Sequence, residues 1–278
     1  MRRLFRWCLI GTVILLIAGI VLGLQCSRIL SAAIRKGVET IGPKATGGSV
    51  TLDRVDLSIL TGAGTLRGFV VGNPPGFKTK DAMRVDAIHV DVDVSSVLSN
   101  VIVIEEIRVT GAEVTYEIGA GTSNISTLQK NIEEFVNATL PKGGAPAGSE
   151  SPAPSNTTGG GDAGGGKKVI IRHFYFEDGK VRLSAALLQG KALALPIPDL
   201  HLTGIGEKTN GETIGEAIRQ LTRPVFDGIA KILSKSTELL KDAGVNLKDL
   251  GGDLKNFGGN LKDMGKGTVD NIKGLFGK

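Results

Sequence analysis

Few side chains in this sequence of 278 residues have types and spacings that could do chemistry. The histidines are His89, His173 and His201, and only the first has acidic neighbours at a useful spacing. His89, Asp91 and Asp93 alternate along a predicted strand, so they share one face, where a hard cation could bridge two of them. Such a row is more often a solvated strand face, and we expect no metal there.

Catalytic signatures are also absent from the sequence. It contains no GxSxG, HExxH, P-loop or GxGxxG motif. Glu105 and Glu106 are adjacent in a predicted strand, so they should point to opposite faces and cannot form an acid–base pair. Cys8 and Cys26 flank a single apolar run and cannot build a disulfide framework or a cysteine metal site. We therefore expect a protein that is not an enzyme and that uses no cofactor.

The composition narrows the class of protein further. Glycine supplies 40 residues, about twice the usual share, but without the period of collagen. Aromatic residues make up only 4% of the chain, so a large aromatic core is not expected. The net charge of +5 is small and spread along the chain, with no basic stripe. We expect no nucleic-acid partner.

An apolar run near the N-terminus predicts a membrane anchor. Residues 7–24 carry no charge, and a helix of that length spans roughly 27 Å, close to the thickness of a bilayer core. Arg2, Arg3 and Arg6 precede the run and should keep the N-terminus in the cytoplasm. A cleaved signal peptide, a lipoprotein signal and a twin-arginine signal are alternatives that fit the run less well.

The segment after the anchor changes from helical spacing to alternation. Residues 1–40 read as the anchor followed by an amphipathic helical stem, which Gly42-Pro43 should end. Residues 41–140 read as short sequential strands closed by a helix at 125–140, with Ser123 or Asn124 as its cap. Strands that follow one another without helices between them predict mostly antiparallel pairing. The alternation slips at Asp53-Arg54, which predicts a bulge.

Residues 141–166 hold no large apolar side chain and are predicted to be a disordered linker rich in Gly, Pro and Ser. Strand patterns return over residues 167–210 and should complete the same sheet. Asp178-Gly179 between two of these strands predicts a hairpin turn. Pro196 and Pro198 predict an edge or a break in the last strand.

The C-terminal part is predicted to be helical. Residues 211–239 form an amphipathic helix that Pro224 should kink. Residues 240–278 are a glycine-rich tail with a heptad repeat, whose apolar positions would form a seam against a membrane surface or a partner helix, or in self-association. Docking of the tail along its own domain is the alternative. The seam consists of Leu247, Leu250, Leu254, Phe257, Leu261 and Met264.

The strand region resembles the AsmA-like family of bacterial envelope proteins, over roughly residues 1–225. The resemblance is carried by Gly62, Gly64, Leu66, Asn73-Pro74, Gly76-Phe77, the Val-Asp alternation at 90–94, Ile104, Gly111, Tyr116-Glu117 and Ser123-Asn124-Ile125. It implies an N-terminal anchor in the inner membrane and a periplasmic sheet bent into a trough. It also implies a link to outer-membrane assembly and to phospholipid transport, and it contributes no catalytic residues. The chain departs from the family in its short length and in its glycine heptads.

We therefore predict an α+β protein with an N-terminal transmembrane helix, a curved, trough-like, mostly antiparallel sheet and long amphipathic C-terminal helices. As a single-pass inner-membrane protein, it would assist lipid handling or envelope assembly through an apolar groove. The alternative for the same residues is an ordinary core covered by the helix at 211–239. The alternative function is a structural scaffold whose tail seam binds a membrane or a partner helix. The predicted groove residues are Val55, Leu57, Ile59, Ile88, Val90, Val92, Val94, Val114, Tyr116 and Ile118.

Overall fold

A computed structural model of the chain describes residues 25, 27–119, 121–139, 167–184 and 193–235. The predicted anchor, the linker at 141–166 and the tail seam lie outside the described residues. Within the described part, no helix has the length and apolarity needed to cross a bilayer. Residues 27–46 form a helix, here called the N-terminal helix, ahead of the first strand. The other elements are β1 (Val50–Leu57), β2 (Ala63–Gly72), β3 (Asp81–Val92), η1 (Val94–Ser96), β4 (Val101–Tyr116), α2 (Asn124–Thr139), β5 (Lys168–Glu177), β6 (Lys180–Leu183), β7 (Leu193–Pro196), β8 (Leu200–Ile205), β9 (Glu212–Thr213) and α3 (Ile214–Lys235).

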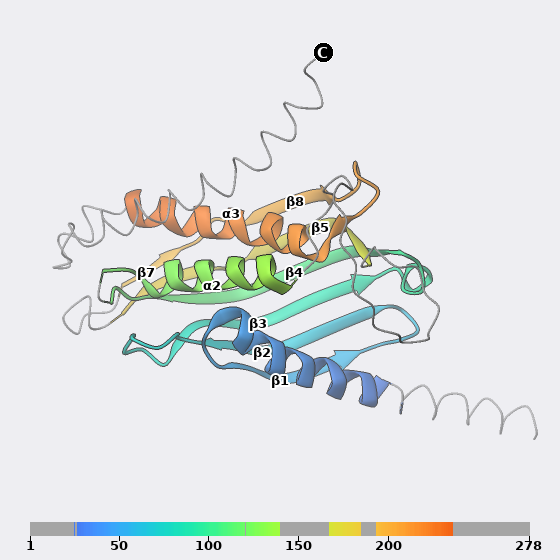
Figure 1. The fold of residues 1–278 in the computed structure, drawn as a ribbon, viewed down its shortest axis with the longest axis horizontal. Helices are drawn as coiled ribbons and strands as arrows, with labels where there is room; N and C mark the ends of the chain where they lie inside the picture. The colour runs from blue at the N-terminus through green and yellow to red at the C-terminus, as the bar shows by residue number, and fades with distance from the viewer. Residues whose placement is uncertain (1–24, 26, 120, 140–166, 185–192, 236–278) are drawn as a thin grey trace, which may run out of the picture.

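The architecture is α+β, as predicted, and the described residues form one layer of helices on one curved, open sheet (Figure 1). The main strand order is β1-β2-β3-β4-β5-β8, with β6, β7 and β9 paired off this path. The N-terminal helix, α2 and α3 all lie on the same face of the sheet (Figure 1). We call this the helix side and the opposite face the outer side.

The sheet is mixed, because β4 pairs in parallel with β5 and with β6. The other pairings are antiparallel, as predicted. The parallel pairs arise because α2 lies between β4 and β5 in the chain and returns it to the end of the sheet where β4 began. The prediction of a hairpin at Asp178-Gly179 is wrong. Strands β5 and β6 run in the same direction along β4, and Asp178, with φ 55°, only interrupts them.

A line of backbone irregularities crosses the sheet, and we call it the crease. In register, Asp53 of β1 lies opposite Gly68 of β2, Gly68 opposite Asp86 of β3, and Asp86 opposite Gly111 of β4, which is followed by Asp178. Three of these residues have positive φ, near 60°. At the crease the alternation of side chains between the two faces shifts by one residue. Successive side chains on the helix side are therefore three residues apart there, Leu52 and Val55 in β1 and Val109 and Ala112 in β4.

The predicted shift in alternation at Asp53-Arg54 is present, but the bulge that was predicted to cause it is not. Strands β1 and β2 pair with one unchanged register from Val50 to Leu57, so neither contains an extra residue there. Both strands change phase together, since Gly68 takes a left-handed conformation opposite Asp53. Register shifts occur elsewhere, for example between Asp91 and Val92 of β3 where it pairs with β4.

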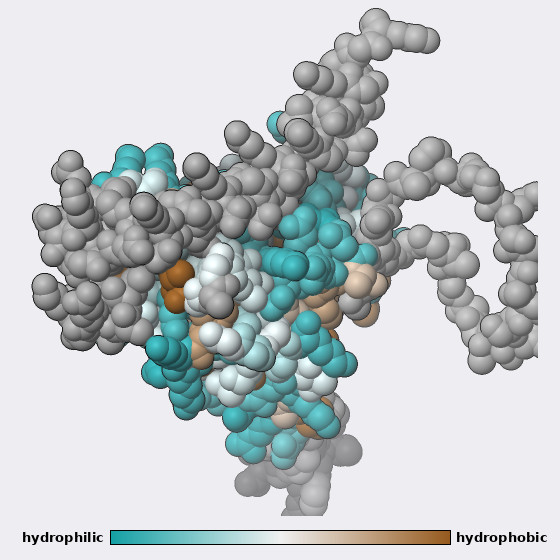
Figure 2. Space-filling view, turned by 60° about the vertical axis from the view of Figure 1, so that its left-hand side comes forward, coloured by the Kyte–Doolittle hydropathy of each residue, from teal (hydrophilic) through white to brown (hydrophobic). Residues whose placement is uncertain are grey.

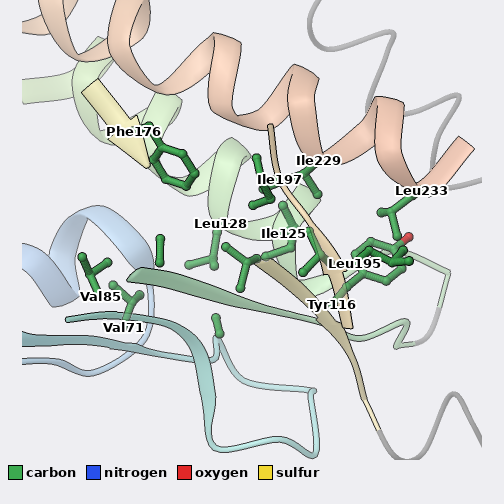
Figure 3. Close-up of a cluster of buried hydrophobic side chains, with 14 of the residues drawn as sticks. Val71, Val85, Tyr116, Ile125, Leu128, Phe176, Leu195, Ile197, Ile229 and Leu233 are labelled. Atoms are coloured by element: carbon green, nitrogen blue, oxygen red, sulfur yellow. The ribbon is translucent and has the colours of Figure 1, made fainter. Parts of the chain in front are cut away.

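The helices close a core that crosses the crease, from Val114 and Tyr116 beyond Gly111 to Phe174 and Phe176 before Asp178 (Figure 3). Tyr116 of β4 lies beside Leu233 of α3, and Ile197 lies beside Ile229 of α3 (Figure 3). Leu128 of α2 belongs to the same cluster of buried side chains. A second, smaller cluster joins Ala217 of α3 to the start of β5 and the end of β8 through Val169, Ile171 and Ile205.

The helix ends follow local capping chemistry. Ser123 caps α2 as predicted, since its Oγ accepts from the backbone N–H of Ser126 at 3.1 Å. The prediction that Gly42-Pro43 ends the first helix is wrong, because the helix continues to residue 46. Its end is at Gly47, whose φ of 73° permits the left-handed C-cap and whose N–H donates to the carbonyl of Pro43 at 2.9 Å. Helix α3 passes through Pro224 as one element.

Candidate functional site

The predicted groove residues divide into two groups. Val114 and Tyr116 are only 2% exposed and lie in the core, so for these two the covered-core alternative describes the structure. Ile118 packs against the same core from beyond the end of β4. The other predicted residues lie on the opposite side of the crease, in β1, in β3 and in the turns that follow these strands.

The apolar side chains of this second group, together with neighbours on β2, form a surface that we call the open strip. Val55 pairs with Leu66 and Leu66 with Ile88, and one step further along the strands Leu57, Gly64 and Val90 are paired. Because alternate residues of a strand share a face, these rows face the helix side together. Every large side chain of the strip is only half-buried. Ile88 packs against the edge of the main core, whereas the other five belong to neither buried cluster. The open strip consists of Val55, Leu57, Leu66, Ile88, Val90 and Val92.

Two helices border the open strip. In Figure 1 the strands at the right are crossed by no helix between α3 above and the N-terminal helix below. The N-terminal helix is fixed to β1 by Glu39, whose Oε1 accepts from the backbone N–H of Leu52 at 3.4 Å. The same carboxylate pairs with Arg35 at 3.1 Å, and this hydrogen bond lowers the pKa of Glu39. The N-terminal helix and α3 therefore lie along two edges of the open strip (Figure 1).

A pocket of about 290 Å³ lies between α3 and the segment that joins β7 to β8. It forms where the chain breaks between β7 and β8 at Pro198, under the part of α3 around Pro224. Phe176 and Val225 contribute apolar walls, and Asp227 lies at its lining, where burial raises the pKa of that carboxyl group. Its size suits part of an acyl chain rather than a whole phospholipid. None of the predicted groove residues lines it.

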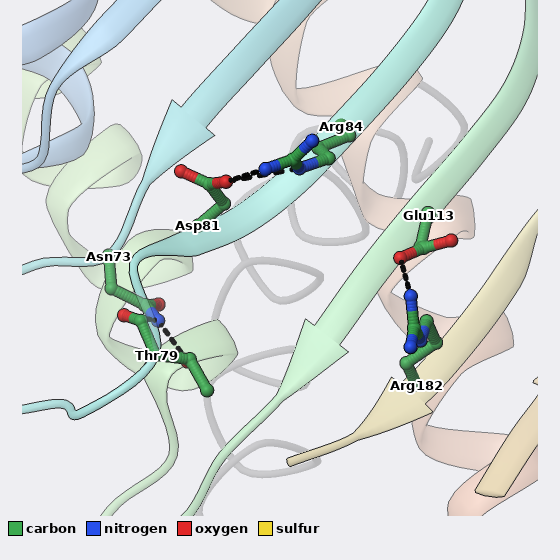
Figure 4. A network of polar contacts seen from close by, with 6 residues as sticks. All are labelled: Asn73, Thr79, Asp81, Arg84, Glu113 and Arg182. Carbon is green, nitrogen blue, oxygen red and sulfur yellow. Dashed lines mark hydrogen bonds and ion pairs between the residues drawn. The ribbon is translucent and has the colours of Figure 1, made fainter. Parts of the chain in front are cut away.

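The outer side of the sheet is polar and charged. Glu113 of β4 pairs with Arg182 at 2.6 Å and with Lys180 at 2.9 Å, and Asp81 pairs with Arg84 (Figure 4). Burial tends to raise the pKa of Glu113, but the hydrogen bonds from the two cations outweigh it and lower that pKa. A charged face of this kind is a poor surface for lipid tails, so the helix side is the candidate site.

All three histidines also lie on the outer side. His89 accepts or donates a hydrogen bond with the hydroxyl of Thr65 at 3.1 Å. His173 and His201 face each other with 3.3 Å between Nδ1 and Nε2, and His201 stacks on Tyr175 at 4.2 Å between ring centroids. The guanidinium of Arg108 lies over the ring of Tyr175, 4.0 Å from the ring centroid.

The carboxylates considered at the sequence level have other partners. Asp93 does not join His89, because its Oδ1 accepts from the backbone N–H of Ser95 at 2.9 Å, and hydrogen bonds from Ser95 lower the pKa of Asp93. Glu106 pairs with Arg108 at 2.9 Å, and hydrogen bonding to this arginine lowers the pKa of Glu106. Among the described residues, no group of three or more possible metal ligands is found.

Sequence reasoning missed two kinds of residue in this region. Leu66 belongs to the open strip, and it stands on β2, whose run of apolar and small residues hides the alternation. Leu60 and Leu98, in the turns after β1 and η1, are 93% and 95% exposed. The signal that could have found them is a leucine at the tip of a turn, where polar residues are expected.

Comparisons with known proteins give no relatives for this arrangement. No family model, no curated protein and no solved structure matches the chain. The fold and the open strip therefore carry the functional argument.

Proposed function

We propose that this chain is a membrane-anchored lipid-binding protein that holds acyl chains against the open strip. The observation that carries the proposal is the half-exposed apolar floor between the N-terminal helix and α3, beside a core that is closed elsewhere. An apolar surface left partly open costs free energy in water, whereas a bound acyl chain would cover it. The role is binding rather than catalysis.

The resemblance to the AsmA-like family supports the same proposal. Gly64, Leu66 and the Val-Asp alternation at 90–94, which carry part of that resemblance, lie in or beside the open strip. We propose an inner-membrane anchor with the sheet on the periplasmic side, where the protein would assist lipid handling or envelope assembly. The phospholipid is bound through its tails, because the floor offers no charged group for a headgroup.

Native mass spectrometry of the full chain, purified without detergent, tests the proposal. We expect a co-purifying phospholipid, and its occupancy should fall when Val90→Asn places an amide on the floor. The control is Val70→Asn, which changes a half-buried valine on β2, between the core-facing Phe69 and Val71, and should leave occupancy unchanged.

Two outcomes contradict the proposal. One is wild-type protein that carries no lipid, which would leave the scaffold function with its tail seam as the better account. The other is an equal loss of lipid in both variants, which would mean that binding does not depend on the helix side. Circular dichroism of each variant confirms that the substitution has left the fold intact.

A further inference from the structure

The exposed apolar side chains of the described residues gather at one end of the sheet. Nine large apolar residues are exposed among them, and all except Ile41 lie at the end that holds the turns after β1 and β3. That end lies at the right in Figure 1. We call its central group the apolar tip, which consists of Ile59, Leu60, Val94, Val97 and Leu98. Ile29 and Leu30 of the N-terminal helix and Ile214 of α3 complete the set.

The two turns of the apolar tip are neighbours in space. The backbone N–H of Val92 donates to the carbonyl of Gly62 at 3.1 Å, which joins the end of β3 to the turn after β1. A Cβ placed on Gly62 would lie 3.0 Å from Cγ2 of Val94. The side chain of Lys167 reaches the same group from the start of β5, where its Nζ donates to the carbonyl of Val97 at 2.6 Å.

The loop after β3 is held by hydrogen bonds from its own polar side chains. Several of its polar side chains bond to its own backbone: Ser96 is buried, and its Oγ accepts from the N–H of Val103 at 2.8 Å. Asp93 caps η1 through Ser95, and Ser99 donates to the carbonyl of Ser96 at 2.8 Å. The loop therefore exposes Val94, Val97 and Leu98, while Asp93, Ser96 and Ser99 bond to its own backbone.

The turn after β1 has the same character. The N–H of Ser58 donates to the carbonyl of Ala63, and the N–H of Gly62 to the carbonyl of Ser58, each at 2.9 Å. Gly62 has a φ of 80°, which lets the turn close tightly. Leu60 is left at its tip with 93% of its surface exposed.

The N-terminal helix begins at this same end of the sheet. Glu39 is level with Leu52 of β1, and the helix runs antiparallel to that strand. Ten residues back along the helix cover about 15 Å, and five residues along β1 cover about 17 Å. Ile29 is therefore level with Leu57, the last residue of β1. The uncharged run at residues 7–24 ends only a few residues before this point.

We propose that the apolar tip inserts into the surface of the bilayer that holds the anchor, so that the open strip ends at the membrane. This inference depends on the membrane anchor of the proposed function. Arg28, Lys167, Lys168 and Lys208 are exposed at or near this end and would lie at the headgroups of anionic lipids. The opposite end, which comes forward in Figure 2, shows a mostly hydrophilic visible surface with only small apolar areas.

Site-specific fluorescence of the full chain in liposomes containing anionic phospholipid tests the inference. Cys8 and Cys26 are replaced by serine, and one new cysteine at Leu60 or at Leu98 carries an environment-sensitive label. Both labels should shift their emission to the blue, become quenched by lipid-borne quenchers and lose accessibility to aqueous iodide. Both positions are more than 90% exposed, so the substitutions leave the packing unchanged.

Two control positions separate location from apolarity. Ile41→Cys labels an exposed apolar position on the same helix, about 18 Å from Ile29 at the helical rise. Lys80→Cys labels the turn before β3, at the opposite end of the sheet. Labels at both controls should remain accessible to iodide.

Labels at Leu60 and Leu98 that stay as accessible as the controls would overturn the inference. The same holds if all four labels become shielded, since the contact would then not be specific to the tip. These readouts do not depend on lipid occupancy. A shielded tip without co-purifying lipid would support the membrane contact and contradict lipid binding. An exposed tip with bound lipid would support lipid binding and contradict the membrane contact.

Discussion

Among the residues that the structure describes, Glu117 is the most deeply buried charged side chain, and it lies just after the end of β4. It is only 3% exposed, and its carboxylate accepts from the backbone N–H groups of Lys78 and Thr79 at 2.7 and 2.8 Å. Its own N–H donates to Asn124, whose amide also reaches the carbonyl of Thr115 at 2.7 Å. These contacts tie the turn before β3 to the start of α2.

The balance of effects on Glu117 sets its behaviour with pH. Burial by itself would raise the pKa of this carboxyl group, but hydrogen bonds from the Thr79 hydroxyl and from the two N–H groups outweigh burial and lower the pKa. Because the pKa of the folded state lies below that of the unfolded state, the ionised group stabilises the protein above about pH 4.3. This contribution is lost as the pH falls through the folded-state value.

Glu117→Gln should therefore lower the free energy of unfolding at neutral pH by about 1–3 kcal/mol, since an amide NH₂ would face N–H donors. The difference from wild type should shrink as the pH falls below about 4.3. Denaturant unfolding at a series of pH values measures both effects. Glu134→Gln, at an exposed position of α2, is the control and should change little. A difference that stays constant down to pH 3 would contradict this account of Glu117.

Among the elements, the sequence was most informative where a single face of an element is apolar. It predicted the strands from alternation, the cap of α2 from Ser123 and the position of α3 from its apolar stripe. It could not predict the parallel pairing of β4 with β5, because pairing direction depends on where α2 returns the chain. Asp178-Gly179 has the composition of a hairpin turn, but β4 continues beside both β5 and β6 and keeps them in line.

The candidate site was predictable in part for the same reason. Alternation identified the side chains of β1 and β3 that face the helices, but it could not say which of them a helix covers. Tyr116 and Val90 have the same pattern in the sequence, yet Tyr116 lies in the core with Leu233 and Val90 lies on the open strip. Coverage is a tertiary property, and it depends on how far α2 and α3 extend over the sheet.

The crease gives a prediction at the level of the strands. Gly111 has a φ of 67°, and a Cβ at this position would lie 2.2 Å from Oδ2 of Asp86. Gly111→Ala should lower the free energy of unfolding by about 1–3 kcal/mol, from backbone strain and from displacement of the carboxylate. Gly37→Ala is the matched control, since it lies in the N-terminal helix with open space around it and should stabilise the protein by up to about 1 kcal/mol. Equal effects of the two substitutions in thermal unfolding would refute the argument.

Helix α3 gives a second prediction, because it closes the core. Leu233 is 1% exposed, and Leu233→Ala should cost about 2–5 kcal/mol of unfolding free energy. Leu60→Ala makes the same change at an exposed turn and should cost less than about 0.5 kcal/mol. Chemical denaturation of the two variants tests whether α3 packs on the sheet as described. Similar stability losses would mean that it does not.

For the whole molecule, the proposal fixes an orientation across the membrane. The arginines before residue 7 should hold the N-terminus in the cytoplasm, so the sheet and its helices should lie on the other side. An alkaline phosphatase fused at Gly160, between α2 and β5 in the chain, should be active. A fluorescent protein that folds only in the cytoplasm should be dark at the same position. The reverse pattern would exclude both the periplasmic location and the anchor as oriented here.

The crease also bears on how the chain finds its strand pairing. A plain alternating strand that slips by two residues still presents its apolar side chains to the same face, so alternation alone tolerates such errors. Here all four strands from β1 to β4 change phase along one line, at Asp53, Gly68, Asp86 and Gly111. A slip by any number of residues would set the phase change of one strand against an unbroken part of its neighbour and would leave a left-handed glycine without its aspartate. The crease thus specifies one strand register, because any other pairing costs free energy during folding. For the same reason it disfavours pairing of this open sheet with strands of other chains.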